Sequence, residues 1–393
     1  MVARVTLRSN PWDAERIALL PWYCLVCGAG GATDVLLNLL LFLPLGVAAR
    51  LLGWPLRSAL PPMMLLTLGI EITQGTLLVG RDASLSDVVA NSLGGAIGWL
   101  TAPTLLTLAN PTELFAKRAA WVALALSALV WIGTGLGFRP SLAADQPWIG
   151  EPLHLWPGHE PFGGTLERAT LDGLPIPDAA MAPSIRRDSL DLVLELTRTS
   201  SRVPVHPVTV VRVLDAHRRI QVAAYLRHEA LVFVTRLRAD AWRLRAPRWE
   251  FPGAMALPLR EPWRFRWTWR PDRVELESGP ATDPARVERR SLPISIGLGW
   301  VFVHPLVETV DPRWVRWTVL WLAWWFGLTG WLAGAAGAGR AIAFGVAALV
   351  CLRAAGALAG IPVPGSELVA GAAAYAGLAA AALARRAWLH RRR

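Results

Sequence analysis

Apolar residues form blocks of membrane-spanning length in both the first and the last third of the chain. Four blocks precede residue 139, over Val35–Leu52, Ala59–Val79, Leu85–Leu108 and Ala119–Phe138. Three more follow a long polar interval, over Val315–Ala335, Ala341–Gly360 and Leu368–Leu383. A helix needs roughly 20 apolar residues to cross the hydrocarbon core of a bilayer. The pattern therefore predicts about seven membrane-spanning helices, in a domain of four helices over 35–138 and a group of three over 313–385.

The N-terminal segment, residues 1–34, is harder to assign. The stretch Ile17–Ala32 is apolar but short, and it contains Pro21 and the glycines Gly28, Gly30 and Gly31. This pattern favours an outer, re-entrant or surface-lying segment over a full span. A cleaved signal peptide is the alternative, because arginines precede an apolar run that ends in small residues.

The polar interval has the pattern of a β domain. Residues 139–162 are punctuated by prolines and read as a linker. Within 163–312, alternation is clearest at Trp263–Arg270, where aromatic residues occupy one face and Arg264, Arg266, Thr268 and Arg270 the other. Further strands are predicted at Leu190–Leu196, Val208–Leu214, Arg219–Arg227 and Ala230–Arg238. We therefore expect an antiparallel β-sandwich, inserted as an all-β domain into an α-helical polytopic membrane protein.

The order of these strands, and the hairpin Trp263–Arg270, Pro271-Asp272, Arg273–Glu277, resemble the laminin-G and concanavalin A-like jelly-roll sandwiches. That resemblance implies binding of glycan or protein and seldom catalysis. For the aromatic row itself, a place in the hydrophobic core is favoured over a sugar-stacking face.

Composition and charge refine this picture. The 393 residues are 53% hydrophobic and only 18% charged, against about 25% charged in soluble domains. A wholly soluble or disordered chain is thereby excluded. The net charge of +11 lies largely in the loops between spans and in the arginine tail 386–393, while bases and acids almost cancel within 139–311. The surplus therefore indicates orientation, with the tail in the cytoplasm and the β domain outside, and no nucleic-acid partner is expected.

Ionisable and amide side chains inside the predicted spans are the candidates for function, since such groups are costly in a membrane. Glu71 and Gln74 share one helix face, as do Asp87 and Asn91. The orientation above lets six residues converge in an outward-facing polar pocket: Asn38, Glu71, Gln74, Arg81, Asp87 and Asn91. Two interpretations stay open, a structural network alone or a network that also lines a ligand site. Gly46, Gly94 and Gly98 would let the helices approach closely.

The ordered motif Asn38-Leu-Leu-Leu-Phe42-Leu-Pro44-Leu-Gly46, Glu71-Ile-Thr-Gln74, Gly80-Arg81 and Asp87-Val-Val-Ala-Asn91-Ser-Leu-Gly94 resembles the VanZ-like family. The resemblance spans about residues 15–108. It implies a small helical membrane domain with a role in the bacterial cell envelope and, by the family's name, glycopeptide (teicoplanin) resistance. Family members usually have a full span before the proline-aromatic segment at Pro21-Trp22, and here that span is missing or reduced.

Other candidates carry less. Arg353 and Glu367 are predicted to pair and to stabilise a helical hairpin, with a contribution to the pocket as the sharper option. His154, His159 and Glu160 have the residue types of metal ligands but no zinc spacing, and Cys24 and Cys27 lack a redox fold around them. We therefore expect neither a metal nor a cofactor.

These features predict a non-catalytic, multi-pass protein of the bacterial cytoplasmic (inner) membrane. Its partners would be a membrane lipid or lipid-linked cell-wall precursor in the pocket, and a glycan or protein on the outer sandwich. The alternative is an intramembrane enzyme or flippase for a lipid-linked precursor, with Glu71 or Asp87 as general base and Arg81 stabilising an anion.

Overall fold

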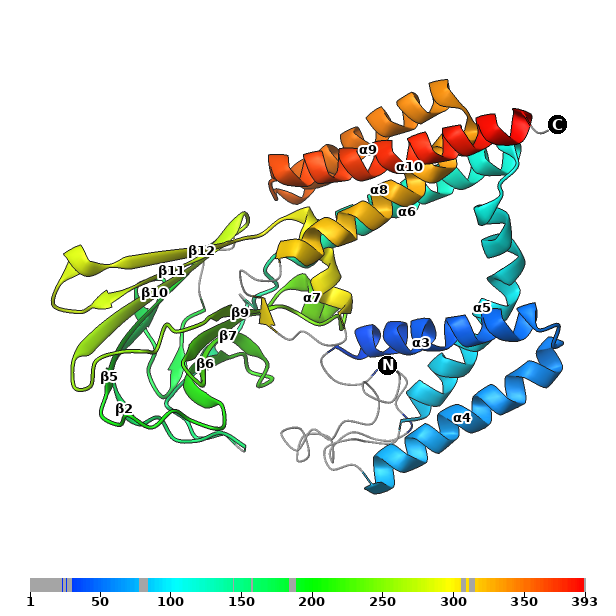
Figure 1. The fold of residues 1–393 in the computed structure, drawn as a ribbon. Coiled ribbons are helices and arrows are strands. Elements are labelled where there is room, and N and C mark those ends of the chain that lie inside the picture. Colours follow the sequence, from blue (N-terminus) through cyan, green and yellow to red (C-terminus); the bar gives the residue numbers. More distant parts are fainter. Residues whose placement is uncertain are drawn as a thin grey trace.

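A computed structural model of the protein describes residues 30–77, 84–143, 145–156, 158–183, 189–304, 309–310 and 315–391, together with Tyr23 and Val26. Its β strands gather at one end of the molecule, and long helices run away from them in two groups (Figure 1). Most of the N-terminal segment over 1–34, including Cys24 and Cys27, lies outside the described residues, as do Arg81 and the end of the arginine tail.

The first group consists of α3 (Gly31–Leu51), α4 (Leu56–Leu77) and α5 (Leu85–Ala109). Helix α3 begins four residues before the predicted span. It lies along α5 over most of its length, and α4 packs on an adjoining face of α5. Prolines occur inside all three helices, and α5 also contains Gly94, Gly95 and Gly98.

The second group consists of α6 (Glu113–Gly137), α8 (Val315–Ala336), α9 (Ala338–Ala359) and α10 (Gly365–Arg391). The sequence boundaries placed α6 with the three helices before it, but α6 packs against α8 and α9. The reason is visible at the end remote from the strands, where Glu113 accepts hydrogen bonds from Arg340 and Arg386, both at 2.6 Å. Large side chains also join these helices, since Trp131 of α6 stacks on Phe326 of α8 with 5.0 Å between ring centroids.

Among the described residues, six helices are long and apolar enough to cross a membrane, namely Gly31–Leu51, Leu85–Ala109, Glu113–Gly137, Arg316–Ala336, Ala338–Ala359 and Gly365–Leu389. They match six of the seven predicted spans. The remaining one, α4, is a helix of 22 residues but is not among the six. It carries Glu71 and Gln74 on its buried face.

The β domain contains two sheets. One has seven strands in the order β13-β9-β8-β7-β6-β1-β4, and the other has six in the order β12-β11-β10-β5-β2-β3. The strands of the first are β1 (Trp148–Pro152), β4 (Ala180–Met181), β6 (Val208–Leu214), β7 (Ile220–Arg227), β8 (Ala230–Thr235), β9 (Arg248–Phe251) and β13 (Thr309–Val310). Those of the second are β2 (Gly164–Leu171), β3 (Leu174–Pro175), β5 (Leu190–Arg198), β10 (Pro262–Arg270), β11 (Arg273–Pro280) and β12 (Glu288–Pro293). All five predicted strands are present, and pairing is antiparallel except between β9 and β13.

The alternating residues of β10 show which face is buried. Phe265, Trp267 and Trp269 are at most 1% exposed, and Trp267 stacks on Phe233 of the opposite sheet with 5.1 Å between ring centroids. The two sheets therefore pack face to face around this row, and the core interpretation of the aromatic residues is confirmed.

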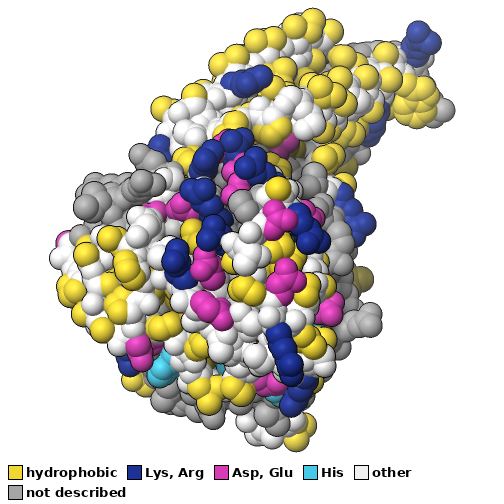
Figure 2. Space-filling model, turned by 90° about the vertical axis from the view of Figure 1, so that its left-hand side faces the viewer, with side chains coloured by type: hydrophobic (Ala, Val, Ile, Leu, Met, Phe, Trp, Pro, Cys, Tyr) yellow, Lys and Arg dark blue, Asp and Glu magenta, His cyan; other side chains and the backbone are white. Residues whose placement is uncertain are grey.

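The arginines of β10 point the other way, into an ion-paired surface. Arg264 pairs with Glu195, and Arg266 with Asp191, each at 2.7 Å from the neighbouring strand β5. Basic and acidic side chains are intermixed across this end of the molecule (Figure 2). Exposed pairs of this kind contribute little to stability, so the row is a solvated face rather than a site.

The proline-rich stretch 139–162 is not a free linker. Its residues form β1, which pairs with both β6 and β4, and a bridge joins Pro140 to Leu237. The domain boundary predicted at residue 163 therefore lies too late in the chain. Prolines fit here because β1 ends at Pro152 and the turns around it need few ladder hydrogen bonds.

One joint links the first helical group to the β domain. The hydroxyl of Thr33, at the start of α3, donates to the Phe302 carbonyl at 2.7 Å and accepts from the Arg245 backbone N–H at 3.0 Å. Beside it, Arg245 pairs with Asp34 at 2.6 Å. The N-terminal end of α3 is thereby held at the β-domain end of the molecule, and Arg50 at its other end lies far from the strands (Figure 1).

Candidate functional site between helices α3, α4 and α5

The polar residues of α4 face into the helix group. Thr67, Glu71 and Gln74 recur at spacings of four and three, so they share one side of the helix. All three are buried, at 0%, 4% and 6% exposure. Met63 continues the same side and lies against α5 at Gly95. A polar stripe on α4 is therefore enclosed by protein.

Two hydrogen bonds connect this stripe to α5. Glu71 Oε2 accepts the backbone N–H of Ser84, the N-cap residue of α5, at 2.8 Å. A carboxylate is stabilised there, because unpaired N–H groups and the helix dipole favour negative charge at a helix N-terminus. One turn further along, Asn91 Nδ2 donates to Thr67 Oγ1 at 2.8 Å.

The amide oxygen of Asn91 accepts no hydrogen bond from the residues that the structure describes. Asn91 is 3% exposed, so this Oδ1 is buried. A buried acceptor without a donor costs roughly 1–3 kcal/mol, so its presence calls for an explanation.

Glycines set the distance between α3 and α5. A Cβ at Gly94 would lie 2.1 Å from the Leu39 carbonyl oxygen, and one at Gly98 would lie 2.0 Å from that of Leu43. On the facing helix, a Cβ at Gly46 would lie 1.9 Å from the Gly95 oxygen. The backbones touch at these three positions, as expected for small residues in membrane helices.

The remaining residues of the predicted pocket are less buried or lie outside the described residues. Asn38 on α3 and Asp87 in the first turn of α5 are half-buried, and Arg81 lies outside the described residues. The structure thus brings together Glu71, Gln74 and Asn91 on adjoining faces of α4 and α5. The contribution of Arg81 stays a prediction.

The pairing of Arg353 with Glu367 is wrong. Arg353 is exposed on the surface of α9, whereas Glu367 is buried and accepts a hydrogen bond from the Ser295 hydroxyl. Ser295 precedes the 3-10 helix η3 (Ile296–Val303), which contacts α6 and α8 at the β-domain end of the bundle. Arg353 was predicted as the partner of Glu367 because the two are close along the chain. The actual partner, Ser295, lies in the segment that leads from the β domain back to the helices. Glu367 therefore links this segment to α10. Neither Arg353 nor Glu367 belongs to the polar cluster of α4 and α5.

The tryptophans of α8 differ in exposure. Trp324 is 68% exposed, while Trp317, Trp321 and Trp325 are partly buried, as expected for packing against neighbours. Trp314 lies outside the described residues.

His159 and Glu160 have structural partners in the β domain. His159 Nδ1 lies 2.7 Å from the Thr209 hydroxyl, and Glu160 accepts the backbone N–H groups of Val205 and His206. Burial, followed by the nearby guanidinium groups of Arg212 and Arg248, lowers the pKa of His159. Among the described residues no group of three metal-ligating side chains occurs.

Sequence analysis missed a buried ion cluster in the β domain. Arg212 on β6 is 2% exposed and pairs with Glu151 of β1, which Arg218 also contacts at 2.8 Å. Trp156 covers it, with the Arg212 guanidinium 3.8 Å from the ring centroid. An arginine within an otherwise apolar strand was the available signal, but its partner lies in the stretch taken for a linker.

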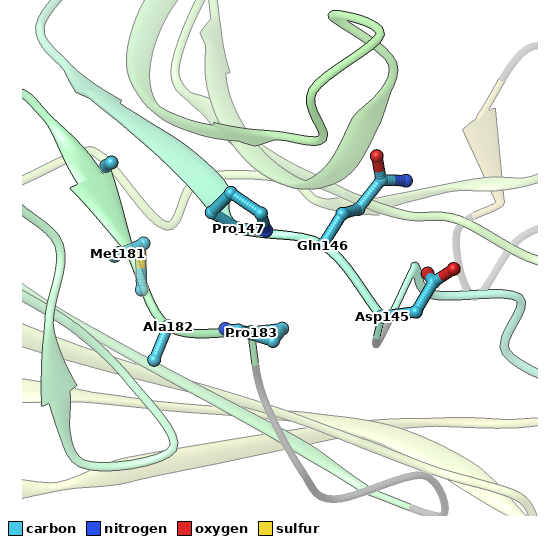
Figure 3. Close-up of a pocket in the computed structure, with 7 residues that line it drawn as sticks. Asp145, Gln146, Pro147, Met181, Ala182 and Pro183 are labelled. Carbon is cyan, nitrogen blue, oxygen red and sulfur yellow. The ribbon is translucent and has the colours of Figure 1, made fainter.

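Two hollows in the β domain were also missed. One, of about 440 Å³, lies between the residues that lead into β1 and the end of β4, and Figure 3 shows Pro147 facing Met181 and Ala182 across it. The other, of about 530 Å³, lies where strands of both sheets end. Both depend on loop positions that a pattern along the sequence does not define.

Comparison with known proteins identifies the first helical group. Residues 3–107 match the VanZ/LLP1 family model. The matched stretch is about a quarter of the chain and ends within α5, so it contains the polar cluster and the three glycines. No curated protein and no solved structure matches the chain. The VanZ-like segment thus coincides with the group α3–α5, and α6 falls outside it, as its packing also indicates.

Proposed function

We propose that this protein is a non-catalytic, multi-pass protein of the bacterial cytoplasmic membrane that binds the headgroup of a lipid or lipid-linked cell-wall precursor in its VanZ-like helices. The β domain would lie outside and bind glycan or protein, as a jelly-roll of the laminin-G type would. A role in glycopeptide (teicoplanin) resistance belongs to the same proposal, because it comes with the family resemblance. The C-terminus would be cytoplasmic.

The unused acceptor of Asn91 carries the proposal. Its Oδ1 is buried beside Thr67, in a group of helices of which two are long and apolar enough to cross a membrane. A hydroxyl or ammonium group of a headgroup would supply the missing donor. An unpaired polar group is costly at membrane depth. A ligand that donates a hydrogen bond to the Asn91 oxygen would remove this cost.

Binding is favoured over catalysis because Glu71 is already engaged. Its carboxylate accepts the Ser84 N–H, which holds the negative charge at the N-terminus of α5. A general base needs an accessible lone pair, whereas Glu71 is buried and one of its oxygens is already bonded to the α5 backbone.

Native mass spectrometry of the detergent-extracted protein tests the proposal. We expect the unmodified chain to retain a co-purified lipid, and Asn91→Ala and Glu71→Gln each to reduce the lipid-bound fraction several-fold. Ser127→Ala is the matched control, because Ser127 is a buried membrane-helix hydroxyl that bonds only its own helix, at the Ala123 carbonyl. Equal lipid retention in all four proteins, with unchanged melting, would refute the headgroup site.

A further inference from the structure

The larger hollow of the β domain has the construction of a binding pocket. It has a volume of about 530 Å³, within the range of roughly 300–1,000 Å³ typical of small-molecule sites. Val208, Leu226 and Met255 form an apolar floor, and each is at most 4% exposed. Polar and aromatic side chains surround this floor.

Strands of both sheets end at this pocket. Gly163 precedes β2 and Arg198 ends β5 in the six-stranded sheet, while Val208 begins β6 and Leu226 lies near the end of β7 in the seven-stranded sheet. The pocket is therefore an opening into the end of the sandwich, positioned by rigid strands rather than by one loop. Sites on such elements are held more firmly than sites on loops alone.

The rim carries more positive than negative charge. Arg198 is oriented by the Met255 and Ser200 carbonyls, at 2.6 and 3.2 Å. Arg202 has a side chain that is 74% exposed and lies 3.6 Å from Glu160. His206 and His228 add two imidazoles.

Glu160 offsets one of these positive charges, because its Oε2 lies 3.6 Å from Arg202 Nη2. Its Oε1 accepts the backbone N–H groups of Val205 and His206, at 3.1 and 3.0 Å. The His206 N–H is the main reason that the pKa of Glu160 is lowered, although burial opposes it, so the carboxylate stays ionised and occupied. Arg198 donates only to neutral carbonyl groups, so its charge leaves the pocket with a net positive charge that favours an incoming anion.

The pocket lies away from the helices. His228 is in the turn before β8, and the far end of β8 leads to α7 (Arg238–Ala241), which contacts α6. Strand β8 has six residues, so its two ends are about 20 Å apart at 3.3 Å per residue. A ligand in the pocket would therefore approach from the side opposite the membrane helices.

We propose that this pocket binds an anionic saccharide, with Arg202 and Arg198 at its carboxylate or phosphate group and the apolar floor under a sugar ring. Phe162, half-buried at the rim, supplies an aromatic ring of the kind on which sugar rings pack. The inference rests on the proposed outward placement of the β domain, where envelope polysaccharides would be the source. It specifies the chemistry and the place of glycan binding.

Calorimetric titration of the full-length, detergent-solubilised protein tests this with three probes: a galacturonate trisaccharide, glucose 6-phosphate and neutral maltotriose. Binding of either anionic probe, at least tenfold tighter than maltotriose and weakened by added salt, is expected. Arg202→Gln should reduce that affinity about tenfold or more, and Phe162→Ala should also weaken it. The carboxylate and phosphate probes distinguish the two kinds of anion.

Arg289→Gln is the matched control, because Arg289 is equally exposed at 79% but lies on β12 of the ion-paired surface. It should leave binding unchanged. Equal affinities for neutral and anionic probes, no binding of any probe, or equal effects of Arg202→Gln and Arg289→Gln would each overturn the inference. Lipid retention by the helices is measured separately, so failure here leaves the headgroup proposal standing, and the reverse also holds.

Discussion

At the scale of single residues, buried charges of this protein are held where backbone and side chains can satisfy them. Asp215, in the turn after β6, has a fully buried carboxylate. It accepts the backbone N–H groups of His217 and Arg219 and the side chains of Arg219, Gln221 and Arg236. Five donors around one carboxylate make it a structural anchor of the turn between β6 and β7.

We predict that Asp215→Asn destabilises the β domain by roughly 2–3 kcal/mol at neutral pH, because it removes the buried counter-charge of Arg236 and of the half-exposed Arg219. Burial by itself would raise the pKa of Asp215, but the Arg219 and His217 contacts outweigh it and lower the pKa. A lowered folded-state pKa gives stability that is complete above the unfolded value of about 3.9 and is lost as the pH falls through the folded value.

Tryptophan-fluorescence unfolding in denaturant, measured across pH, checks this. The difference between the unmodified protein and Asp215→Asn should be constant from pH 6 to 8 and should shrink below about pH 4. A difference that stays constant down to pH 2 would contradict the ionic explanation.

At the scale of elements, contact between α3 and α5 depends on glycines. We predict that Gly94→Ala destabilises the helix group by about 1–3 kcal/mol, because the new methyl group would lie 2.1 Å from the Leu39 oxygen and must push the helices apart. Gly69→Ala on α4 is the control, since no atom lies within 4 Å of its Cβ position. That variant should be neutral or slightly stabilising, because alanine is the better helix former by about 1 kcal/mol. The melting temperatures of both variants in detergent test this prediction. Equal melting temperatures for Gly94→Ala and Gly69→Ala would contradict it.

The elements also show which features a sequence pattern can predict. Periodicity located the helices and the strands of the β domain, since burial of one face imposes a repeat of 3.6 or 2 residues. It also put Glu71 and Gln74 on one helix face and marked Gly94 and Gly98 as contact positions. These are properties that a segment carries by itself.

Partners distant along the chain were not predictable in this way. Glu367 bonds Ser295 rather than Arg353, and Arg212 pairs with Glu151, which lies in the predicted linker. Glu113 of α6 bonds Arg340 of the C-terminal helices. Each depends on where two segments meet in space, which no local repeat encodes. The acceptor of Asn91 belongs to this class as well, since only the packing of α4 against α5 shows that one half of its amide is used.

At the scale of the whole molecule, the chain is two helical groups that share one β domain. Helix α5 leans from α3 and α4 toward the start of α6 at the end remote from the strands, and the joint around Thr33 links the first group to the β domain at the other end (Figure 1). At that remote end, Trp331 of α8 and Arg385 of α10 also donate to the Leu108 and Ala109 carbonyls, at 2.9 and 2.6 Å. The VanZ-like helices are thus attached at both ends and are otherwise separate from the C-terminal bundle.

This arrangement predicts one orientation in the membrane. The helix ends remote from the strands carry most of the basic residues of the helices, namely Arg50, Arg57, Lys117, Arg118, Arg340, Arg385 and Arg386. Positive charge in short loops is retained in the cytoplasm, so the β domain should lie outside. Two single-cysteine variants report the two sides, Arg289→Cys on β12 and Arg57→Cys in the first turn of α4. Each is made in a chain whose three native cysteines are replaced by alanine. With a membrane-impermeant maleimide on spheroplasts, the cysteine at position 289 should be labelled at once and the cysteine at position 57 only after permeabilisation. The opposite labelling would place the β domain in the cytoplasm and would remove the basis for an extracytoplasmic saccharide ligand.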